Sequence, residues 1–305
     1  MTTTQPGAAE RSAQPPAHAP ASADAGMLLV CLIWGTNYSV VKYALAMMPP
    51  LAFTATRFAI SSVLLAAILR WREGKIYVPR NLWLPMVLLG ILGNTAYQIA
   101  FTLGLAHTTA TNSSLIISTM PTIVVLFGAI FGIERPTPRM VLGVLLGTGG
   151  VILVIAAKGV AFSRSHLFGD LISVAALFCW AGYTLGVRRY LQGASPLSVT
   201  AITCLTGTPG LILAGLPELA ALQWTAIPAG AWGALLYASV LSLVVAYFIW
   251  NTNVQRVGTS RTSIYMCVTP LVAACAAWVL LGERPVPLQG VGAAMIFAGV
   301  LLARR

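Results

Sequence analysis

Residues 121–143 read PTIVVLFGAIFGIERPTPRMVLG, and residues 270–292 read PLVAACAAWVLLGERPVPLQGVG. Both stretches share a proline, an E-R-P-x-P turn and a glycine at the same spacing, and all six identities are separated by 149 residues. An offset of 146 relates three further pairs, which are Trp34 and Trp180, Pro50 and Pro196, and Thr54 and Thr200. A unit that fills half the chain is too long for a solenoid repeat, which indicates a duplicated domain.

The composition indicates a membrane protein. Hydrophobic residues make up 58% of the chain and charged residues only 8%, whereas soluble domains have about 45–50% and about 25%. Runs of roughly 20 apolar residues, long enough to cross a bilayer, recur along almost the whole chain. The five cysteines all fall inside such runs, which indicates small buried residues and not a disulfide framework.

These runs predict an all-α integral membrane protein with ten transmembrane helices. Five helices fall in each copy, so the second copy enters the membrane from the opposite face, and the two five-helix repeats are inverted. We expect a disordered cytoplasmic tail at residues 1–25, a first repeat at residues 26–158 and a second at residues 169–305. The predicted spans are 27–46, 51–70, 82–104, 111–132, 139–157, 169–191, 196–215, 228–251, 262–281 and 287–303.

The charges predict the orientation. With both termini in the cytoplasm, most Lys and Arg residues lie on that side, and only Lys158, Arg164 and Arg284 lie outside. We therefore expect a multi-pass protein of the inner (plasma) membrane. Orientation and anionic lipid then account for the net charge of +11, so the partners are the bilayer and a small molecule, not nucleic acid. An oligomer is allowed but not required.

Aromatic and amide side chains recur at helical spacing in both halves. Trp34 lies eight residues after Gly26, about 12 Å along a helix, so it sits near the midplane rather than in the interfacial aromatic belt. Such polar groups line either a watered cavity or a buried helix–helix contact. The candidate substrate-binding residues are Trp34, Asn37, Tyr38, Tyr97, Gln98, Phe101, Asn112, Ser114, Trp180, Tyr183, Tyr247, Trp250, Asn251 and Tyr265.

Two prolines and one arginine are further candidates. Pro121 and Pro270 lie mid-span and deprive the carbonyls of Ile117 and Met266 of a helical partner, so they are either simple kinks or hinges beside a cavity. Arg57 lies about 10 Å deep and either snorkels to the interface or contacts a substrate carboxylate.

Catalytic and metal-binding chemistry is not indicated. No Asp, Glu or His occupies the middle of a predicted span, and no metal-ligand cluster, catalytic dyad or phosphate-binding loop is evident. We expect no enzyme activity, no metal and no cofactor. Spans five and ten are rich in glycine and alanine, which predicts close helix packing.

Several motifs resemble the EamA-type members of the drug/metabolite transporter superfamily. They are W-G-T-N-Y at residues 34–38, Arg57-Phe58, A-T-N-S-S-L-I at residues 110–116, W-A-G-Y at residues 180–183, the E-R-P turn and G-E-R at residues 282–284. The resemblance covers residues 27–303 and implies ten helices around a central cavity, often with export of amino acids, including aromatic ones. The small multidrug members of that superfamily use a Glu in their first helix, which this first span lacks.

We therefore expect a secondary transporter or facilitator that exports small amphipathic metabolites, above all aromatic and other apolar amino acids. The alternatives are a multidrug transporter or a carrier of another metabolite, such as a sugar phosphate or nucleobase. A membrane enzyme or lipid-handling scaffold is a further alternative, but it would be expected to carry acid–base or metal residues at cavity depth.

The inverted repeat predicts that the two E-R-P turns face opposite sides of the membrane. Single cysteines replacing Thr137 and Val286, which hold equivalent positions, should react with a membrane-impermeant maleimide from opposite sides. Labelling of both from the same side would contradict the inverted arrangement.

Overall fold

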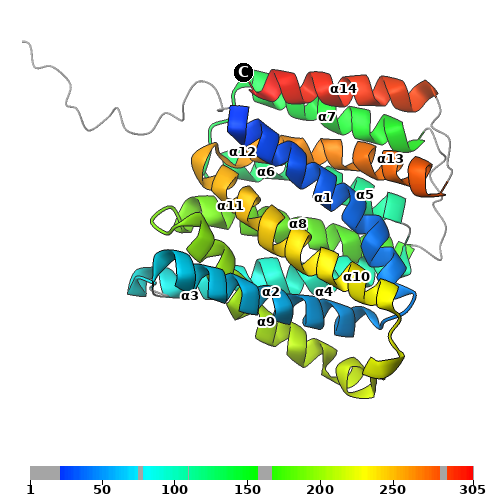
Figure 1. Cartoon of the computed structure of the whole chain (residues 1–305). Coiled ribbons are helices and arrows are strands. Elements are labelled where there is room, and N and C mark those ends of the chain that lie inside the picture. The colour runs from blue at the N-terminus through cyan, green and yellow to red at the C-terminus, as the bar shows by residue number, and fades with distance from the viewer. Residues whose placement is uncertain (1–20, 75–77, 109, 157–166, 282–286, 305) are drawn as a thin grey trace, which may run out of the picture.

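The computed structural model describes residues 21–74, 78–108, 110–156, 167–281 and 287–304. Within these ranges the chain is helical with short turns and forms no strand. The helices lie side by side in one bundle, and the start of α1 and the end of α14 lie at the same end of it (Figure 1).

The two halves contain their α- and π-helices in the same order, and the second half also contains two 3-10 helices. The first half contains α1 (Ala21–Leu45), α2 (Pro50–Glu73), α3 (Arg80–Gly90), the π-helix η2 (Ile91–Ala96), α4 (Tyr97–His107), α5 (Ala110–Ser118), α6 (Met120–Ile130) and α7 (Pro138–Ala156). The second half contains α8 (Leu167–Tyr190), α9 (Pro196–Ala221), the 3-10 helix η3 (Trp224–Ala226), α10 (Ala229–Tyr237), the π-helix η4 (Ala238–Val245), α11 (Ala246–Arg256), α12 (Thr259–Ser263), the 3-10 helix η5 (Ile264–Val268), α13 (Thr269–Leu281) and α14 (Pro287–Arg304).

Helix occupies each of the ten predicted ranges, with one correction at the start. The sequence predicts a disordered tail up to residue 25, but α1 already begins at Ala21. These residues include three alanines, which favour helix, and Asp24 lies in the first turn, where a carboxylate is stabilised by the helix dipole. The rest of the predicted tail, residues 1–20, and the connection at residues 157–166 lie outside the described residues.

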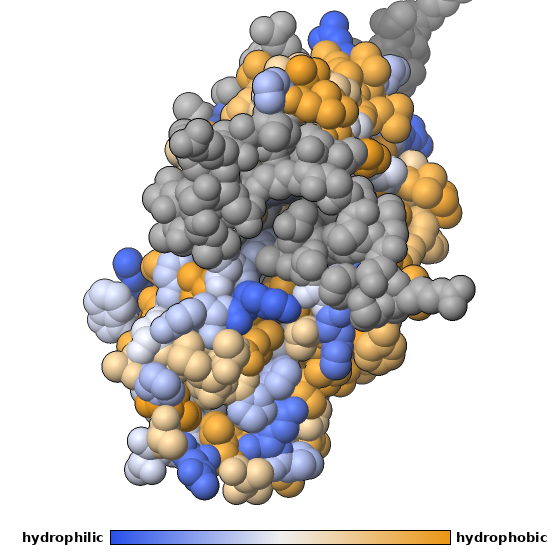
Figure 2. Space-filling model, turned by 90° about the vertical axis from the view of Figure 1, so that its right-hand side faces the viewer, coloured by the Kyte–Doolittle hydropathy of each residue, from blue (hydrophilic) through white to orange (hydrophobic). Residues whose placement is uncertain are grey.

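Six helical stretches are long and apolar enough to cross a membrane. They are 23 to 28 residues long, which exceeds the roughly 20 residues that a bilayer requires. Figure 2 looks onto the end of the bundle opposite the described termini and shows hydrophilic residues toward its middle and base, with hydrophobic residues along the margins. The six stretches are Ala23–Leu45, Pro50–Glu73, Arg80–His107, Leu167–Tyr190, Pro196–Ala221 and Ala229–Arg256.

The two sequence repeats interlock instead of forming separate cores. Helix α2 packs on its equivalent α9, and α7 packs on its equivalent α14. Individual residues also touch their own equivalents, as the hydroxyls of Ser62 and Thr208, 146 residues apart, lie 2.7 Å from each other. The amide of Gln98 donates to the hydroxyl of Tyr247 at 2.7 Å across an offset of 149. The interior is therefore built from both halves at once.

Glycines bring α7 and α14 into close contact, as the small residues of spans five and ten predicted. A Cβ atom added to Gly299 would lie 2.5 Å from the carbonyl oxygen of Gly143, and one added to Gly150 would lie 2.6 Å from that of Gly292. Both distances are too short for a side chain. The prediction that these two helices pack closely is confirmed, and the structure shows that they pack on each other.

We expect Gly299→Ala to destabilise the protein, because the added methyl group would push α14 away from the backbone of α7. Overpacking of this kind typically costs about 1–3 kcal/mol. Gly290 lies on the same helix with no atom within 4 Å of its added Cβ, so Gly290→Ala is the matched control. Thermal unfolding in detergent should show a lower Tm for Gly299→Ala and an unchanged or higher Tm for Gly290→Ala.

Candidate functional site

Aromatic side chains from both halves meet at the centre of the bundle. Trp34 of α1 and Trp180 of α8 are equivalent in the repeat, and their ring centroids lie 5.7 Å apart. The ring of Tyr247 in α11 lies 5.9 Å from that of Trp34 and 5.1 Å from that of Trp180. The ring of Tyr97 in α4 lies 4.9 Å from that of Trp180. The aromatic faces predicted for separate helices thus form one cluster.

A cavity lies against this aromatic cluster. The space that the centres of water molecules can occupy is about 30 Å³, room for roughly one or two waters and far below the ~300–1,000 Å³ of typical ligand pockets. Several residues predicted to bind substrate line this cavity. They are Trp34, Asn37, Tyr38, Arg57, Tyr97, Gln98, Phe101, Trp180 and Tyr247. The wall also contains Ile117 and Met266, whose carbonyls the two prolines deprive of a helical partner, and Ser242, which was not predicted.

Broken helices bring Ile117 and Met266 to the wall. Helix α5 ends at Ser118 just before Pro121, and the chain preceding Pro270 runs as the 3-10 helix η5. These interruptions occur where proline removes a backbone N–H. Ile117 and Met266 are the residues four positions before the two prolines, so a signal for them was present in the sequence.

Two π-helices also adjoin the wall. Residues 91–96 of η2 correspond to residues 240–245, which lie within η4, at the repeat offset of 149. A π-turn holds an extra residue and is frequent at functional sites. Gln98 follows η2 closely and Tyr247 follows η4, while the indole N–H of Trp34 donates to the carbonyl oxygen of Ser242 in η4 at 3.1 Å. The indole N–H of Trp34 therefore has its hydrogen-bond partner within the protein.

Arg57 in α2 places a positive charge in this wall. Its side chain is only 1% exposed, so it does not snorkel to the interface. Its Nη2 donates to Oε1 of Gln98, and the guanidinium carbon lies 5.4 and 5.7 Å from the ring centroids of Phe53 and Phe58. Its Nε and the Oδ1 of Asn37 are buried without a hydrogen-bond partner. Lys42, by contrast, is exposed and donates to carbonyl oxygens at the end of α4.

No carboxylate of the described chain neutralises Arg57. Each described acidic side chain has polar contacts elsewhere. Asp24 accepts from Tyr265, Glu73 from Ser195 and Ser198, Glu134 from the start of α12, Asp170 from Thr108, and Glu218 from the start of α2. A buried charge without a counter-charge is costly, so an anionic group entering the cavity would gain most beside Arg57. Among the described residues no His, Cys, Asp and Glu side chains are grouped to hold a metal ion.

Three predicted residues lie in a buried layer behind the wall. The ring of Tyr183 stacks on Trp180 at 5.1 Å between centroids, and the ring of Trp250 lies 5.3 Å from that of Trp34. The amide of Asn251 donates to the hydroxyls of Tyr183 at 2.9 Å and of Thr200 at 3.0 Å. This layer lies between the cavity wall and the ends of α8 and α11.

The structure does not bring every predicted residue to the described wall. Tyr265 instead donates to the carboxylate of Asp24 at the start of α1. Ser114 is buried in α5, where its carbonyl oxygen accepts from the hydroxyl of Ser118 at 2.6 Å. The side chain of Asn112 lies outside the described residues.

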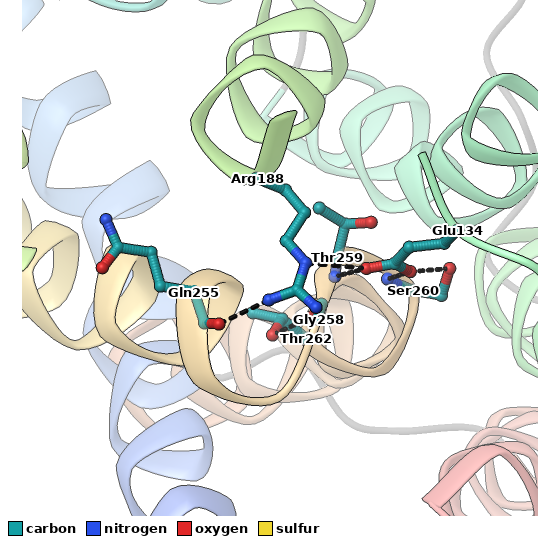
Figure 3. Close-up of polar contacts among 7 residues, drawn as sticks. All are labelled: Glu134, Arg188, Gln255, Gly258, Thr259, Ser260 and Thr262. Carbon is teal, nitrogen blue, oxygen red and sulfur yellow. Dashed lines mark hydrogen bonds and ion pairs between the residues drawn. The ribbon is translucent and has the colours of Figure 1, made fainter. Parts of the chain in front are cut away.

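A polar cluster around Glu134 was not predicted, because this residue stood only as part of the E-R-P turn. Figure 3 shows its carboxylate between the start of α12 and the guanidinium of Arg188. The Nε of Arg188 lies 3.8 Å from Oε1 of Glu134. Two signals could have found it, since Glu134 belongs to the repeated E-R-P turn and Arg188 is equivalent to the basic Lys42 at the offset of 146.

The chain is similar along almost its whole length to several proteins that are named as transporters, exporters or efflux pumps. An uncharacterized transporter of Archaeoglobus fulgidus is 32% identical over 90% of this chain and 95% of its own. A probable terminal-alkyne amino-acid exporter of Streptantibioticus cattleyicolor is 28% identical over 92% of each chain. A probable amino-acid metabolite efflux pump of Escherichia coli is 27% identical over 90% of this chain and 92% of its own.

The fold and the family agree with these relatives. A solved crystal structure of a protein that is 21% identical has the same fold, with a TM-score of 0.77 over 93% of this chain and 97% of the other. Residues 21–156 and 167–305 each match the EamA-like transporter family. Because these matches cover both halves, the protein belongs to the EamA-like transporter family and is a multi-pass membrane transporter.

Proposed function

We propose that the protein is a secondary transporter that exports small amphipathic amino acids, aromatic and other apolar ones, through the central cavity. The observation that carries this proposal is a buried guanidinium, with no carboxylate partner in the described part of the chain, in a wall of aromatic rings. The rings hold the apolar body of the substrate by contact area, and Arg57 binds its carboxylate. Asn37 and Gln98 complete the polar contacts.

The proposed arrangement is ten membrane spans in two inverted five-helix repeats. The protein lies in the plasma (inner) membrane, with both termini in the cytoplasm. A residue that touches its own equivalent lies on a two-fold axis, as the pairs Ser62–Thr208 and Gln98–Tyr247 do. Because each copy has an odd number of spans, five, the second copy enters the membrane from the opposite face. The two-fold axis therefore lies in the membrane plane. The arginines near the described termini support a cytoplasmic location of that end.

The small volume of the cavity requires movement during transport. A space of about 30 Å³ holds water, not an amino acid, so the wall must open to admit substrate. The interruptions before Pro121 and Pro270 are the proposed hinges, since a broken helix bends without loss of further hydrogen bonds. Their equivalence in the repeat fits a protein that opens in turn to each side.

The charge in the wall separates this proposal from the alternatives. A permanently cationic drug would be repelled by Arg57, which disfavours multidrug export. A sugar phosphate would supply an anion, but the wall pairs a single basic residue mainly with aromatic rings. The names of two relatives, a probable amino-acid exporter and a probable amino-acid metabolite efflux pump, support the amino-acid class.

We expect Trp34→Ala and Trp180→Ala each to lower the flux of labelled phenylalanine into proteoliposomes by roughly tenfold, because each removes a ring that contacts the substrate. The control is Trp71→Ala, which removes an indole that is 77% exposed. Flux in the wild type should saturate and should be competed by other apolar amino acids. Absence of any amino-acid flux beside robust flux of a sugar phosphate or a quaternary cation would overturn the proposal.

We expect the wild type to transport phenylalanine at least about tenfold better than phenylalaninamide, because a charged hydrogen-bonded contact contributes roughly 1.5–3 kcal/mol. Arg57→Gln should abolish this preference, and Arg57→Lys should retain part of it. Arg72→Gln, at the end of the same helix, is the control and should leave the preference unchanged. An equal preference in the wild type and Arg57→Gln would show that Arg57 does not bind the carboxylate.

A further inference from the structure

One carboxylate ties together the helices that enclose the cavity at one end of the protein. Glu134 follows α6, and its Oε1 accepts from the backbone N–H of Thr259 at the start of α12. Its Oε2 accepts from the backbone N–H of Ser260 at 2.9 Å and from the hydroxyl of Ser260 at 2.7 Å. Both oxygens of Glu134 are thus engaged by α12 (Figure 3).

The backbone is shaped to receive this carboxylate. Gly258, directly before α12, has a φ of +105°, a backbone conformation that residues with a side chain rarely adopt. A Cβ atom at Gly258 would lie 2.8 Å from Oε1 of Glu134. Glycine therefore permits both the turn from α11 into α12 and the close approach of Glu134.

Arg188 extends the cluster to two further helices. It lies in the last turn of α8, where its Nε faces Oε1 of Glu134 at 3.8 Å and its Nη1 donates to the carbonyl oxygen of Gln255 near the end of α11. The hairpin after α6, the end of α8, the end of α11 and the start of α12 are consequently joined through two side chains. We call Glu134 and Arg188 with their contacts on Gln255, Thr259 and Ser260 the latch.

The latched helices also form the cavity wall. Trp180 lies eight residues before Arg188 on α8, and Tyr247 lies eight residues before Gln255 on α11, about 12 Å in each case. Met266 of the wall follows α12 on the same chain segment, and Ile117 precedes α6. A solute that moves between the cavity and the latched end must separate these segments.

Buried side chains fill the space between the cavity and the latch on α8 and α11. Tyr183 and Val187 of α8 and Trp250 and Val254 of α11 are all fully buried. They lie between the cavity and the latched end, where both described termini also lie (Figure 1). The latch is therefore the polar cluster that joins these helices beyond their buried side chains.

We propose that Glu134 and Arg188 hold the cytoplasmic gate shut and must release the start of α12 before substrate enters the cavity from the cytoplasm. This inference rests on the proposed transport function and orientation. Opening separates α12 from the hairpin after α6 and from α8, which exposes the buried layer to water from the cytoplasm. Glutamine at position 134 keeps the size of the side chain but loses the charge and one acceptor oxygen, so it weakens the latch.

A reporter cysteine tests the gate without any substrate. Thr184 lies on α8 between Trp180 and Arg188, is fully buried, and its hydroxyl has no hydrogen-bond partner, so Thr184→Cys is a mild change. The background carries replacements of the five native cysteines and must retain transport. A membrane-impermeant maleimide is applied to inside-out and right-side-out vesicles, and the rate of labelling is measured.

The expected result is slow labelling of Thr184→Cys alone and at least fivefold faster labelling after addition of Glu134→Gln, from the cytoplasmic side only. Ser260→Ala removes one of the three hydrogen bonds to Glu134, so it should raise the rate by a smaller factor and guards against misfolding of the glutamine variant. Arg188→Gln should raise the rate as well.

Glu218 provides the matched control. Its Oε2 accepts from the backbone N–H groups of Leu51 and Ala52 at 2.7 and 2.9 Å, so it caps the start of α2 as Glu134 caps α12, away from the latch. Glu218→Gln should leave the labelling rate of Thr184→Cys unchanged. Equal rates with and without Glu134→Gln, or an equal rise with Glu218→Gln, would overturn the gate. Faster labelling from the other side of the membrane would support the gate and overturn the proposed orientation.

Discussion

The main constraint on this protein is that hydrocarbon offers no hydrogen bonds to the backbone. Each N–H and C=O group at membrane depth needs a partner within the protein, which makes long α-helices the default structure of the chain. The departures from α-helix are therefore informative. The π-helices η2 and η4, the break between α5 and α6, and the 3-10 helix η5 all adjoin the same cavity wall. Irregular backbone is concentrated where polar groups and ligand would meet.

Duplication explains why these irregularities come in pairs. Equivalent segments of the two halves face each other across the centre, so a feature encoded once per copy appears twice around one cavity. The two copies have nevertheless diverged in chemistry. Gln98 in the first copy corresponds to Tyr247 in the second, and these two side chains bond to each other while only the first also binds Arg57. The cavity is therefore asymmetric, with its charge on one side.

Position decides what each charged side chain does. Arg57, at the centre, has no carboxylate partner in the described chain, whereas Arg188, at one end, lies beside Glu134. A paired charge near the surface can break and re-form at modest cost, which suits a closure that opens repeatedly. A buried unpaired charge gains much from an anionic ligand, which suits a binding site. One bundle thus uses the same type of side chain for two purposes.

Periodicity and duplication predicted the helices, because the apolar length needed for a membrane helix and the repeat of a 23-residue stretch are local properties of the chain. They also predicted most of the cavity wall, because Trp34, Tyr97 and Trp180 lie at matching depths on facing helices. Tyr265 was expected there as well, yet the 3-10 turn of η5 rotates it away toward Asp24. The direction of a side chain after a helix break depends on neighbouring elements and not on spacing.

The sequence by itself determined the helical class, the two copies and the kinds of side chain available at the centre. Only the tertiary structure decided that Arg57 is buried with no carboxylate partner among the described residues and that Glu134 turns inward to hold α12. Both are contacts between segments far apart in the chain, 41 residues for Arg57 with Gln98 and 126 for Glu134 with Ser260. Hydrophobic patterning specifies which face of a helix is buried, but it does not specify which distant polar group that face will meet.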